Sequence, residues 1–269
     1  MKFKHLLSHY LKADTRYTVH SPFVFDLMEE VLESDKLYYD FAVFEAERRK
    51  LLTSTQTINV TDLGAGSRKI NHSNRSIAEM SRTALSNPMK CQIIFKIIDY
   101  LGLENRLELG TSLGIMSLYM FGPQKDSRRF ITLEGCPETL QVAQQVHKNL
   151  GLRIDSRLGN FDETLNQALS DLQEVHCVYI DGNHTYKATM RYVSQCLSYS
   201  ATNSLIILDD IYWSEGMYQA WTECKNMNSF NLSISMHGLG FLFKNDQFRQ
   251  KQDFDLIQYS YKPWKFDLF

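Results

Sequence analysis

From about residue 105 onward, short apolar runs alternate with amphipathic stretches, which predicts strands separated by single helices. Strands are expected at 106–109, 129–133, 153–158, 175–180 and 204–208. These strands are apolar along most of their length, so both faces of the sheet are expected to be covered by helices. Two further runs, Leu232–Met236 and Phe241–Phe243, flank His237-Gly-Leu-Gly240 and predict an antiparallel hairpin at one side. The pattern therefore predicts an α/β fold with a doubly wound, mostly parallel sheet.

The remaining segments lack this alternation. Residues 1–90 are expected to be mainly helical, and residues 246–269 form a tail rich in aromatic and charged side chains, for which the sequence suggests no function. We therefore expect an N-terminal extension (1–90) that covers the site, a central domain (91–245) that holds the sheet, and a C-terminal tail (246–269).

Composition excludes several classes of protein. The 269 residues include 29 basic and 31 acidic side chains, a net charge of −2, which argues against a nucleic-acid binder. No apolar run approaches the length of a membrane span, and the apolar stretch at the start is too short for a signal peptide. We expect a soluble, cytoplasmic protein. Five widely spaced cysteines predict reduced, buried thiols rather than a disulfide frame or zinc site: Cys91, Cys136, Cys177, Cys196 and Cys224.

The first strand-to-helix turn, Leu107-Glu-Leu-Gly-Thr-Ser-Leu-Gly114, is the expected ligand loop of a doubly wound sheet. The dinucleotide fingerprint needs glycines where Ser112 and Ile115 stand, which weakens a nicotinamide or flavin hypothesis. Glu134 follows Gly114 by 20 residues, the spacing of a carboxylate that accepts hydrogen bonds from ribose hydroxyls. The alternative is that Glu134 caps the helix that begins at Pro137.

A second glycine turn, Val60-Thr-Asp-Leu-Gly-Ala-Gly-Ser67, also resembles a nucleotide loop. No β-rich strand ending in an acid follows it at about 20 residues, so we expect residues 60–75 to be an accessory loop over the site. Residues 63–90 carry five basic side chains against Glu79 alone. They face either an anionic group of a ligand or, as charge runs more often do, solvent.

Five motifs stand in order at predicted strand ends: LELGTSLG, TLEG, RLGNFDETL, YIDGNH and ILDD. Together they resemble the class I S-adenosylmethionine-dependent methyltransferases, especially the small-molecule O-methyltransferases, over residues 91–245. The resemblance implies a Rossmann-like sheet of seven strands, with S-adenosylmethionine as the cofactor.

The resemblance also implies which residues bind the cofactor. Glu108, Gly110 and Gly114, with Thr111 and Ser112 of the same turn, would hold the methionine part. Glu134 would take the ribose, and Asp181 would stand beside the cofactor. Asn160 and Phe161 would lie by the adenine, although Asn160 stands where the family more often has an acid.

Three carboxylates follow the fourth and fifth strands of the pattern: Asp181, Asp209 and Asp210. Neighbouring parallel strands would bring them together, and oxygen ligands suit Mg²⁺ or another hard divalent cation. The arrangement is similar to metal-dependent sugar and catechol O-methyltransferases, in which the metal holds the acceptor oxygens. There a base follows the fourth-strand acid by about three residues, which is the position of His184. The alternative roles are structural, with the two aspartates in a loop that caps the helix after Ser214, and His184 as another helix cap.

The sequence thus predicts an S-adenosylmethionine-dependent methyltransferase that methylates a hydroxyl of a small or saccharide-like molecule with metal assistance, through His184 and Asp181 as catalytic residues. The alternatives are a non-catalytic methyltransferase-like binding protein, a nicotinamide-dependent oxidoreductase, and metal-free N- or O-methylation with His184 alone as base. A small-molecule acceptor is the expected partner, with no nucleic acid and no membrane. A homo-oligomer is compatible with the sequence, which does not determine the oligomeric state.

Overall fold

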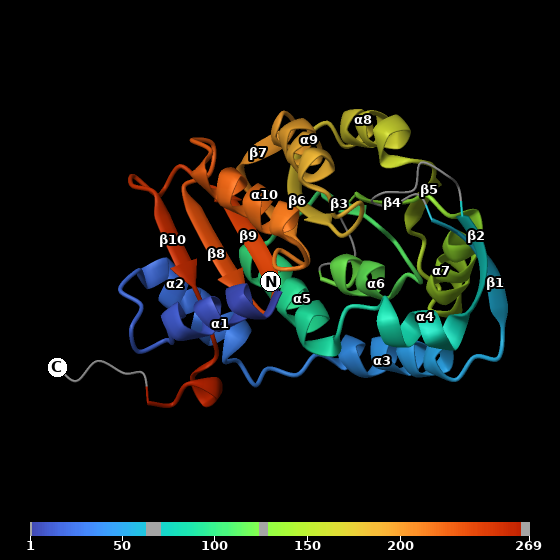
Figure 1. Ribbon diagram of the computed structural model, residues 1–269, viewed down its shortest axis with the longest axis horizontal. Coiled ribbons are helices and arrows are strands. Elements are labelled where there is room, and N and C mark those ends of the chain that lie inside the picture. Colours follow the sequence, from blue (N-terminus) through green and yellow to red (C-terminus); the bar gives the residue numbers. More distant parts are fainter. Residues whose placement is uncertain (1, 63–70, 124–128, 265–269) are drawn as a thin grey trace. The chain divides into compact units, whose positions relative to one another are not determined.

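The computed structural model describes residues 2–62, 71–123 and 129–264 (Figure 1). The chain divides into two compact units, which are described separately below. The central unit comprises Leu37–Asn183, and the terminal unit combines Met1–Lys36 with His184–Phe269. The expected domain limits fall inside these units, because helix α5 (Pro88–Leu101) runs across residue 90.

A parallel sheet forms the core of the central unit. Its strands, in spatial order, are β6 (Val175–Ile180), β3 (Arg106–Leu109), β4 (Phe130–Glu134) and β5 (Asp155–Leu158). Leu109 pairs with both Leu133 and Ile180, so the carboxyl ends of β3, β4 and β6 lie in register. The residues that follow these strands therefore meet at one edge of the sheet.

Helices cover both faces of this sheet. Helices α6 (Ile115–Phe121) and α7 (Pro137–Asn149) lie on one face, and α8 (Phe161–Leu172) lies on the other (Figure 1). Helix α7 begins with a proline in its first turn and buries Leu140, Ala143 and Val146, as an amphipathic helix against a sheet should. The predicted doubly wound arrangement is confirmed here.

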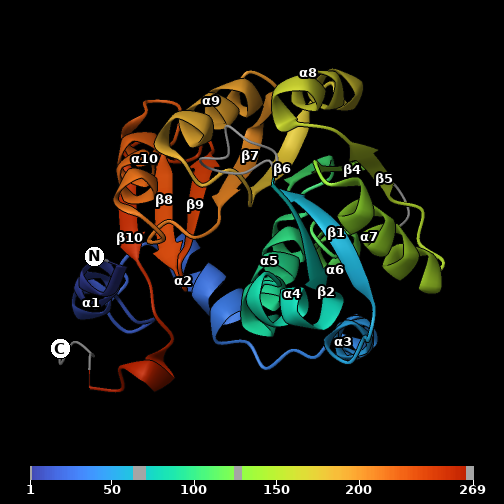
Figure 2. The same ribbon diagram turned by 45° about the vertical axis from the view of Figure 1, so that its right-hand side comes forward.

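The part of residues 1–90 that belongs to the central unit is not helical throughout. Helices α3 (Tyr39–Leu52) and α4 (Ile77–Thr83) are separated by a hairpin of β1 (Thr57–Asp62) and β2 (Asn71–Ser76). The hairpin lies beside α7 (Figure 1, Figure 2), where the Thr61 N–H lies 3.4 Å from Cys136 Sγ. The second glycine turn, with Gly64 and Gly66, lies outside the described residues.

The terminal unit contains four more strands: β7 (Ser200–Leu208), β8 (Leu232–Met236), β9 (Leu239–Lys244) and β10 (Gln252–Asp255). The predicted hairpin is confirmed, because β9 pairs antiparallel with both β8 and β7. Strand β10 pairs parallel with β8. Among the described residues, eight strands thus follow the first hairpin, one more than the resemblance implies, because the C-terminal tail contributes β10.

The helices of the terminal unit come from both ends of the chain. They are α1 (Lys2–Lys12), α2 (Pro22–Leu27), the π-helical turn η1 (Met28–Leu32), α9 (Tyr186–Leu197), α10 (Glu215–Asn226) and the short 3-10 turn η2 (Tyr259–Tyr261). Ser214 caps α10 as predicted, since its Oγ accepts from the Met217 N–H at 3.2 Å. All five cysteines are free and buried, which confirms that expectation. Within the described ranges, no helix is both long and apolar enough to span a membrane.

Candidate functional site

The turn after β3 approaches the end of β6 very closely. Gly110 has a φ of +104°, and a Cβ at this position would stand 2.0 Å from the backbone oxygen of Asp181. The Gly110 N–H donates to Leu133 O at 2.9 Å, so β4 also fixes the turn. Only glycine fits both the dihedral angle and the space. The structure thus brings Gly110 and Asp181 together at the predicted edge.

Gly114, the second glycine of the turn, contacts His147, which was not among the predicted site residues. Gly114 has a φ of +82° and stands directly before α6. His147 Nε2 of helix α7 lies 3.3 Å from Gly114 O, and a Cβ on Gly114 would meet this ring at 2.8 Å. Burial lowers the pKa of His147 to about 4, so the ring is neutral at physiological pH.

Glu108 lies under the same turn and is fully buried. Its Oε2 accepts hydrogen bonds from Ser117 Oγ and, at 2.6 Å, from Thr132 Oγ1, whereas Oε1 is buried without a partner among the described residues. Thr111 joins this cluster, because its Oγ1 lies 2.5 Å from Thr132 Oγ1. Burial, with a smaller contribution from the negative charges of Asp181 and Glu134, raises the pKa of Glu108 to about 8.

Glu134 links two turns at this edge. Its Oε2 accepts from the Ser112 N–H at 2.8 Å, and its Oε1 accepts from the Cys136 N–H at 2.9 Å. The first contact holds Ser112 at a φ of +49°, and the second lies at the start of α7, as the helix-cap alternative requires. Burial raises the pKa of Glu134, with a contribution from the charge of Asp181.

The loop between β5 and α8 brings an aromatic ring to the same edge. Asn160 caps α8, since its Oδ1 accepts from the Asp162 N–H at 3.1 Å. The Phe161 ring is 2.7 Å from the position that a Cβ on Gly182 would take. Phe161 therefore lies against the backbone of Gly182, which follows Asp181. The Asn160 side chain caps the N-terminus of α8.

Asp181 is linked by hydrogen bonds to Tyr179 and, through it, to Ser86. The Tyr179 hydroxyl donates to Asp181 Oδ2 at 3.3 Å, and Ser86 Oγ lies 3.3 Å from the same hydroxyl. Ser86 comes from the segment before α5, so residues 1–90 reach this edge of the central unit. Tyr179 is the first residue of the YIDGNH motif but is not among the predicted site residues, and Ser86 belongs to no motif.

The remaining candidate residues belong to the terminal unit. Asp209 is buried, and its Oδ1 accepts from the Asp210 N–H at 2.6 Å. Asp210 has a φ of +52°. The His184 ring lies 6.5 Å from the Trp213 ring, and the helix cap of α9 is Thr185 rather than His184. Within residues 2–62, 71–123 and 129–264, no three His, Cys, Asp or Glu side chains form a cluster that would hold a metal ion.

Comparisons with known proteins agree with this geometry. Residues 107–211 match the family model described as a methyltransferase domain. The match begins in β3 and ends just after Asp210, so it includes every candidate residue named above for the cofactor, the base and the metal.

Solved structures share the fold at low sequence identity. A methyltransferase of Podospora anserina with bound S-adenosylhomocysteine is 12% identical, with a TM-score of 0.57 over 83% of this chain and 94% of that one. An O-methyltransferase of Bacillus cereus, also in complex with S-adenosylhomocysteine, is 17% identical, with a TM-score of 0.51 over 60% and 82%. TomG, an O-methyltransferase of Streptomyces achromogenes involved in tomaymycin synthesis and bound to S-adenosylmethionine, is 13% identical, with a TM-score of 0.52 over 82% and 93%.

These likenesses confirm the predicted Rossmann-like methyltransferase fold, and the family match over residues 107–211 is consistent with the resemblance stated above. Among curated proteins, none matches this chain in sequence. The edge itself suits S-adenosylmethionine, whose sulfonium and ammonium groups are positive. Glu108, Glu134 and Asp181 interact electrostatically there, and Glu108 Oε1 has no partner among the described residues.

Proposed function

We propose that this protein is an S-adenosylmethionine-dependent methyltransferase that methylates a hydroxyl of a small or saccharide-like molecule. The observation that carries the proposal is the acidic carboxyl edge of the central unit. There, the unpartnered Oε1 of Glu108 lies within electrostatic reach of Glu134 and Asp181, beside a turn that only Gly110 permits. A buried carboxylate oxygen without a hydrogen-bond partner among the described residues is costly, and a cationic ligand compensates it.

The cofactor residues follow from this edge. Glu108 and the turn Gly110-Thr-Ser-Leu-Gly114 bind the methionine end, with Glu108 Oε1 toward its ammonium group. Glu134 binds the ribose hydroxyls with the lone pairs that the Ser112 and Cys136 amides leave unused. Phe161 packs on the adenine, and Asn160 acts by fixing the start of α8. When bound, S-adenosylmethionine supplies an electrophilic methyl group on sulfur.

The acceptor side requires a base and close positioning. Methyl transfer is an in-line displacement, so the acceptor hydroxyl must lose its proton while it is held at near-attack distance. His184 takes this proton as a neutral imidazole, and Asp181 orients the reacting groups from the end of β6. We infer that residues 91–245 supply the cofactor site, that residues 1–90 cover the substrate, and that 246–269 complete the fold as a tail.

The proposed function also includes assistance by a divalent metal ion. Asp181, Asp209 and Asp210 supply only carboxylate oxygens, the donor type that Mg²⁺ prefers. Asp181 directly follows β6, and Asp209 and Asp210 directly follow β7. A bound divalent cation lowers the pKa of an acceptor hydroxyl. The proposal rests on the donor chemistry and on these positions in the chain.

Calorimetric titration of the full chain with S-adenosylmethionine, S-adenosylhomocysteine and NAD tests the function. We expect both sulfur ligands to bind with micromolar constants and NAD not to bind. Absence of binding by either sulfur ligand would overturn the proposal, and binding of NAD alone would favour the oxidoreductase alternative. For the metal, we expect Mg²⁺ or Mn²⁺ to raise Tm. An unchanged response in Asp210→Asn would refute this site, while Asp162→Asn, an exposed change on α8, is the matched control.

A further inference from the structure

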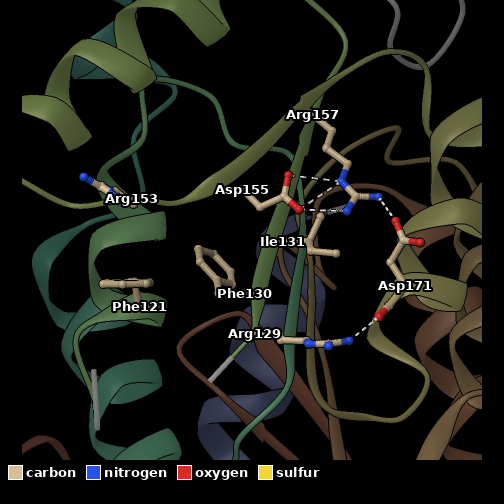
Figure 3. A pocket seen from close by; sticks show the side chains of 8 residues that line it. All are labelled: Phe121, Arg129, Phe130, Ile131, Arg153, Asp155, Arg157 and Asp171. Atoms are coloured by element: carbon tan, nitrogen blue, oxygen red, sulfur yellow. Dashed lines mark hydrogen bonds and ion pairs between the residues drawn. The ribbon is translucent and has the colours of Figure 1, made fainter. Parts of the chain in front are cut away.

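A second crevice opens at the other edge of the same sheet, about 340 Å³ in volume. It is built where β4 and β5 begin, from the end of α6, and from the last turn of α8 (Figure 3). Its lining consists of Phe121, Arg129, Phe130, Ile131, Arg153, Asp155, Arg157 and Asp171. Glu134 lies three residues beyond Ile131 along β4, roughly 10 Å at the rise of a strand. The crevice is therefore separate from the proposed cofactor site, and its size suits a small ligand.

Both acidic side chains of the crevice are engaged by one arginine. Arg157 Nη1 donates to Asp171 Oδ2 at 2.6 Å, and Arg157 Nη2 donates to Asp155 Oδ2 at 2.7 Å. Arg157 Nε donates to Asp155 Oδ1 at 3.1 Å. This pairing raises the pKa of Arg157 and lowers that of Asp171. Both carboxylates are therefore already engaged by Arg157.

The two other arginines, Arg129 and Arg153, form no salt bridge with a carboxylate of the described residues. Arg129 Nη1 donates to the backbone oxygen of Asp171 at 2.7 Å, a contact that brings no negative charge. Arg153 makes no hydrogen bond or ion pair with any residue in the described part of the chain. Three guanidinium groups against two carboxylates give the crevice a net positive charge, and the unused N–H groups have the fork geometry that binds carboxylate or phosphate oxygens.

The floor of the crevice is apolar. Phe130 and Ile131 are buried within the fold, whereas Phe121 is only partly buried. The rings of Phe121 and Phe130 are 6.4 Å apart and tilted by 48°. In Figure 3, Phe130 lies between Phe121 and the Asp155–Arg157 pair, so the apolar surface adjoins the charged one. An inorganic anion would use the guanidinium groups but not this surface.

We propose that this crevice is a second ligand site, which binds a small aromatic anion through Arg129 and Arg153 and packs its ring on Phe121 and Phe130. The anionic group is a carboxylate or a phosphate monoester, since both match a guanidinium fork. The inference does not depend on the proposed function, because no cofactor residue lines the crevice.

The experiment uses the full chain and four probes: benzoate, phenyl phosphate, neutral benzamide and inorganic phosphate. Binding is measured by ligand-observed NMR and calorimetry. We expect benzoate or phenyl phosphate to bind with a dissociation constant of about 1 mM or below, which is reasonable for a ligand of this size. Benzamide and inorganic phosphate should bind at least about tenfold more weakly. If benzoate binds with the higher affinity, the natural ligand is a carboxylate; if phenyl phosphate does, it is a phosphate monoester.

Variants locate the binding. Arg153→Gln and the double variant Arg129→Gln/Arg153→Gln should weaken the aromatic anion about tenfold or more. Arg49→Gln, an exposed arginine on α3 of the same unit, removes the same charge and should leave the affinity unchanged. Arg153→Gln alone decides the result if the double variant does not fold. The proposal is overturned if neither aromatic anion binds up to about 10 mM, if inorganic phosphate binds as tightly as phenyl phosphate, or if Arg153→Gln and Arg49→Gln bind equally well.

Discussion

At the carboxyl edge of the central sheet the polar side chains are the carboxylates of Glu108, Glu134 and Asp181, whereas the amino edge carries three arginines. Burial raises the pKa of both glutamates. The arginines lie at the surface, and among the described residues Arg157 alone of the three forms salt bridges with carboxylates. One sheet thus offers a site for a cation at one end and a site for an anion at the other.

The difference has a structural cause. The carboxyl edge receives turns that are held by glycines and by backbone amides, which brings backbone and buried acids close together. The amino edge receives the ends of helices and the starts of strands, where long side chains reach outward. Specific binding is therefore expected to depend on backbone geometry at the first edge and on side-chain charge at the second.

The largest effect is expected from Gly110→Ala. The new Cβ would collide with Asp181 O and require a φ of +104°, so we expect no measurable S-adenosylmethionine binding and a loss of about 2–4 kcal/mol in unfolding free energy. Gly151→Ala is the matched control, because it has a φ of +67° with open space around the Cβ. It should cost about 1–2 kcal/mol and leave binding intact. Equal binding by the Gly110 variant would show that this turn is not the cofactor loop.

A pH dependence of cofactor binding is expected from Glu108. Its pKa of about 8 means that the free protein holds a proton there at pH 7, and a cationic ligand favours the ionised form. Affinity for S-adenosylmethionine should rise between pH 6 and 8, by up to about tenfold per pH unit, with release of a proton. Calorimetry in buffers of different ionisation enthalpy measures the number of protons released on binding. A pH profile that is the same in Glu108→Gln as in the wild type would contradict the role of Glu108.

The neutral His147 predicts a different pH effect, on stability. Its pKa in the fold is about 4, below the ordinary value of 6.5, so protons favour the unfolded chain. The stability that depends on neutral His147 is complete above pH 6.5 and is lost as pH falls toward 4, by about 3 kcal/mol at most. Urea unfolding from pH 7 to 4 measures the loss. His147→Gln should flatten this part of the curve, and an unchanged curve would remove His147 as its cause.

The smallest effect is expected from Arg153→Gln on cofactor binding. Arg153 lies at the opposite edge from Glu134 and has no partner among the described residues, so the affinity for S-adenosylmethionine should change by less than about twofold. Calorimetry at one pH is enough to check this. A larger change would mean that the two edges are coupled, which would break the comparison between them.

The sheet, and the edge at which Gly110 and Asp181 meet, could be predicted from the sequence, because apolar strands, glycine turns and strand-end acids are local patterns. Strand β10 and the hairpin of β1 and β2 could not, since Gln252–Asp255 and Asn71–Ser76 are largely polar and are strands only through their neighbours. His147 and Ser86 escaped prediction for the same reason, since each makes its contact with a residue far away in the chain. The arginine crevice has no motif, because its lining comes from four separate elements.

The central claim is that the acidic carboxyl edge binds S-adenosylmethionine, and Glu134→Ala tests it most directly. The control is Glu163→Ala, an exposed acid on α8 whose replacement removes the same charge. In side-by-side calorimetry we expect Glu134→Ala to weaken S-adenosylmethionine by about 10–100-fold, as loss of charge-assisted hydrogen bonds should, and Glu163→Ala to bind like the wild type. If a folded Glu134→Ala protein binds the cofactor as tightly as the wild type, the account of this edge is wrong.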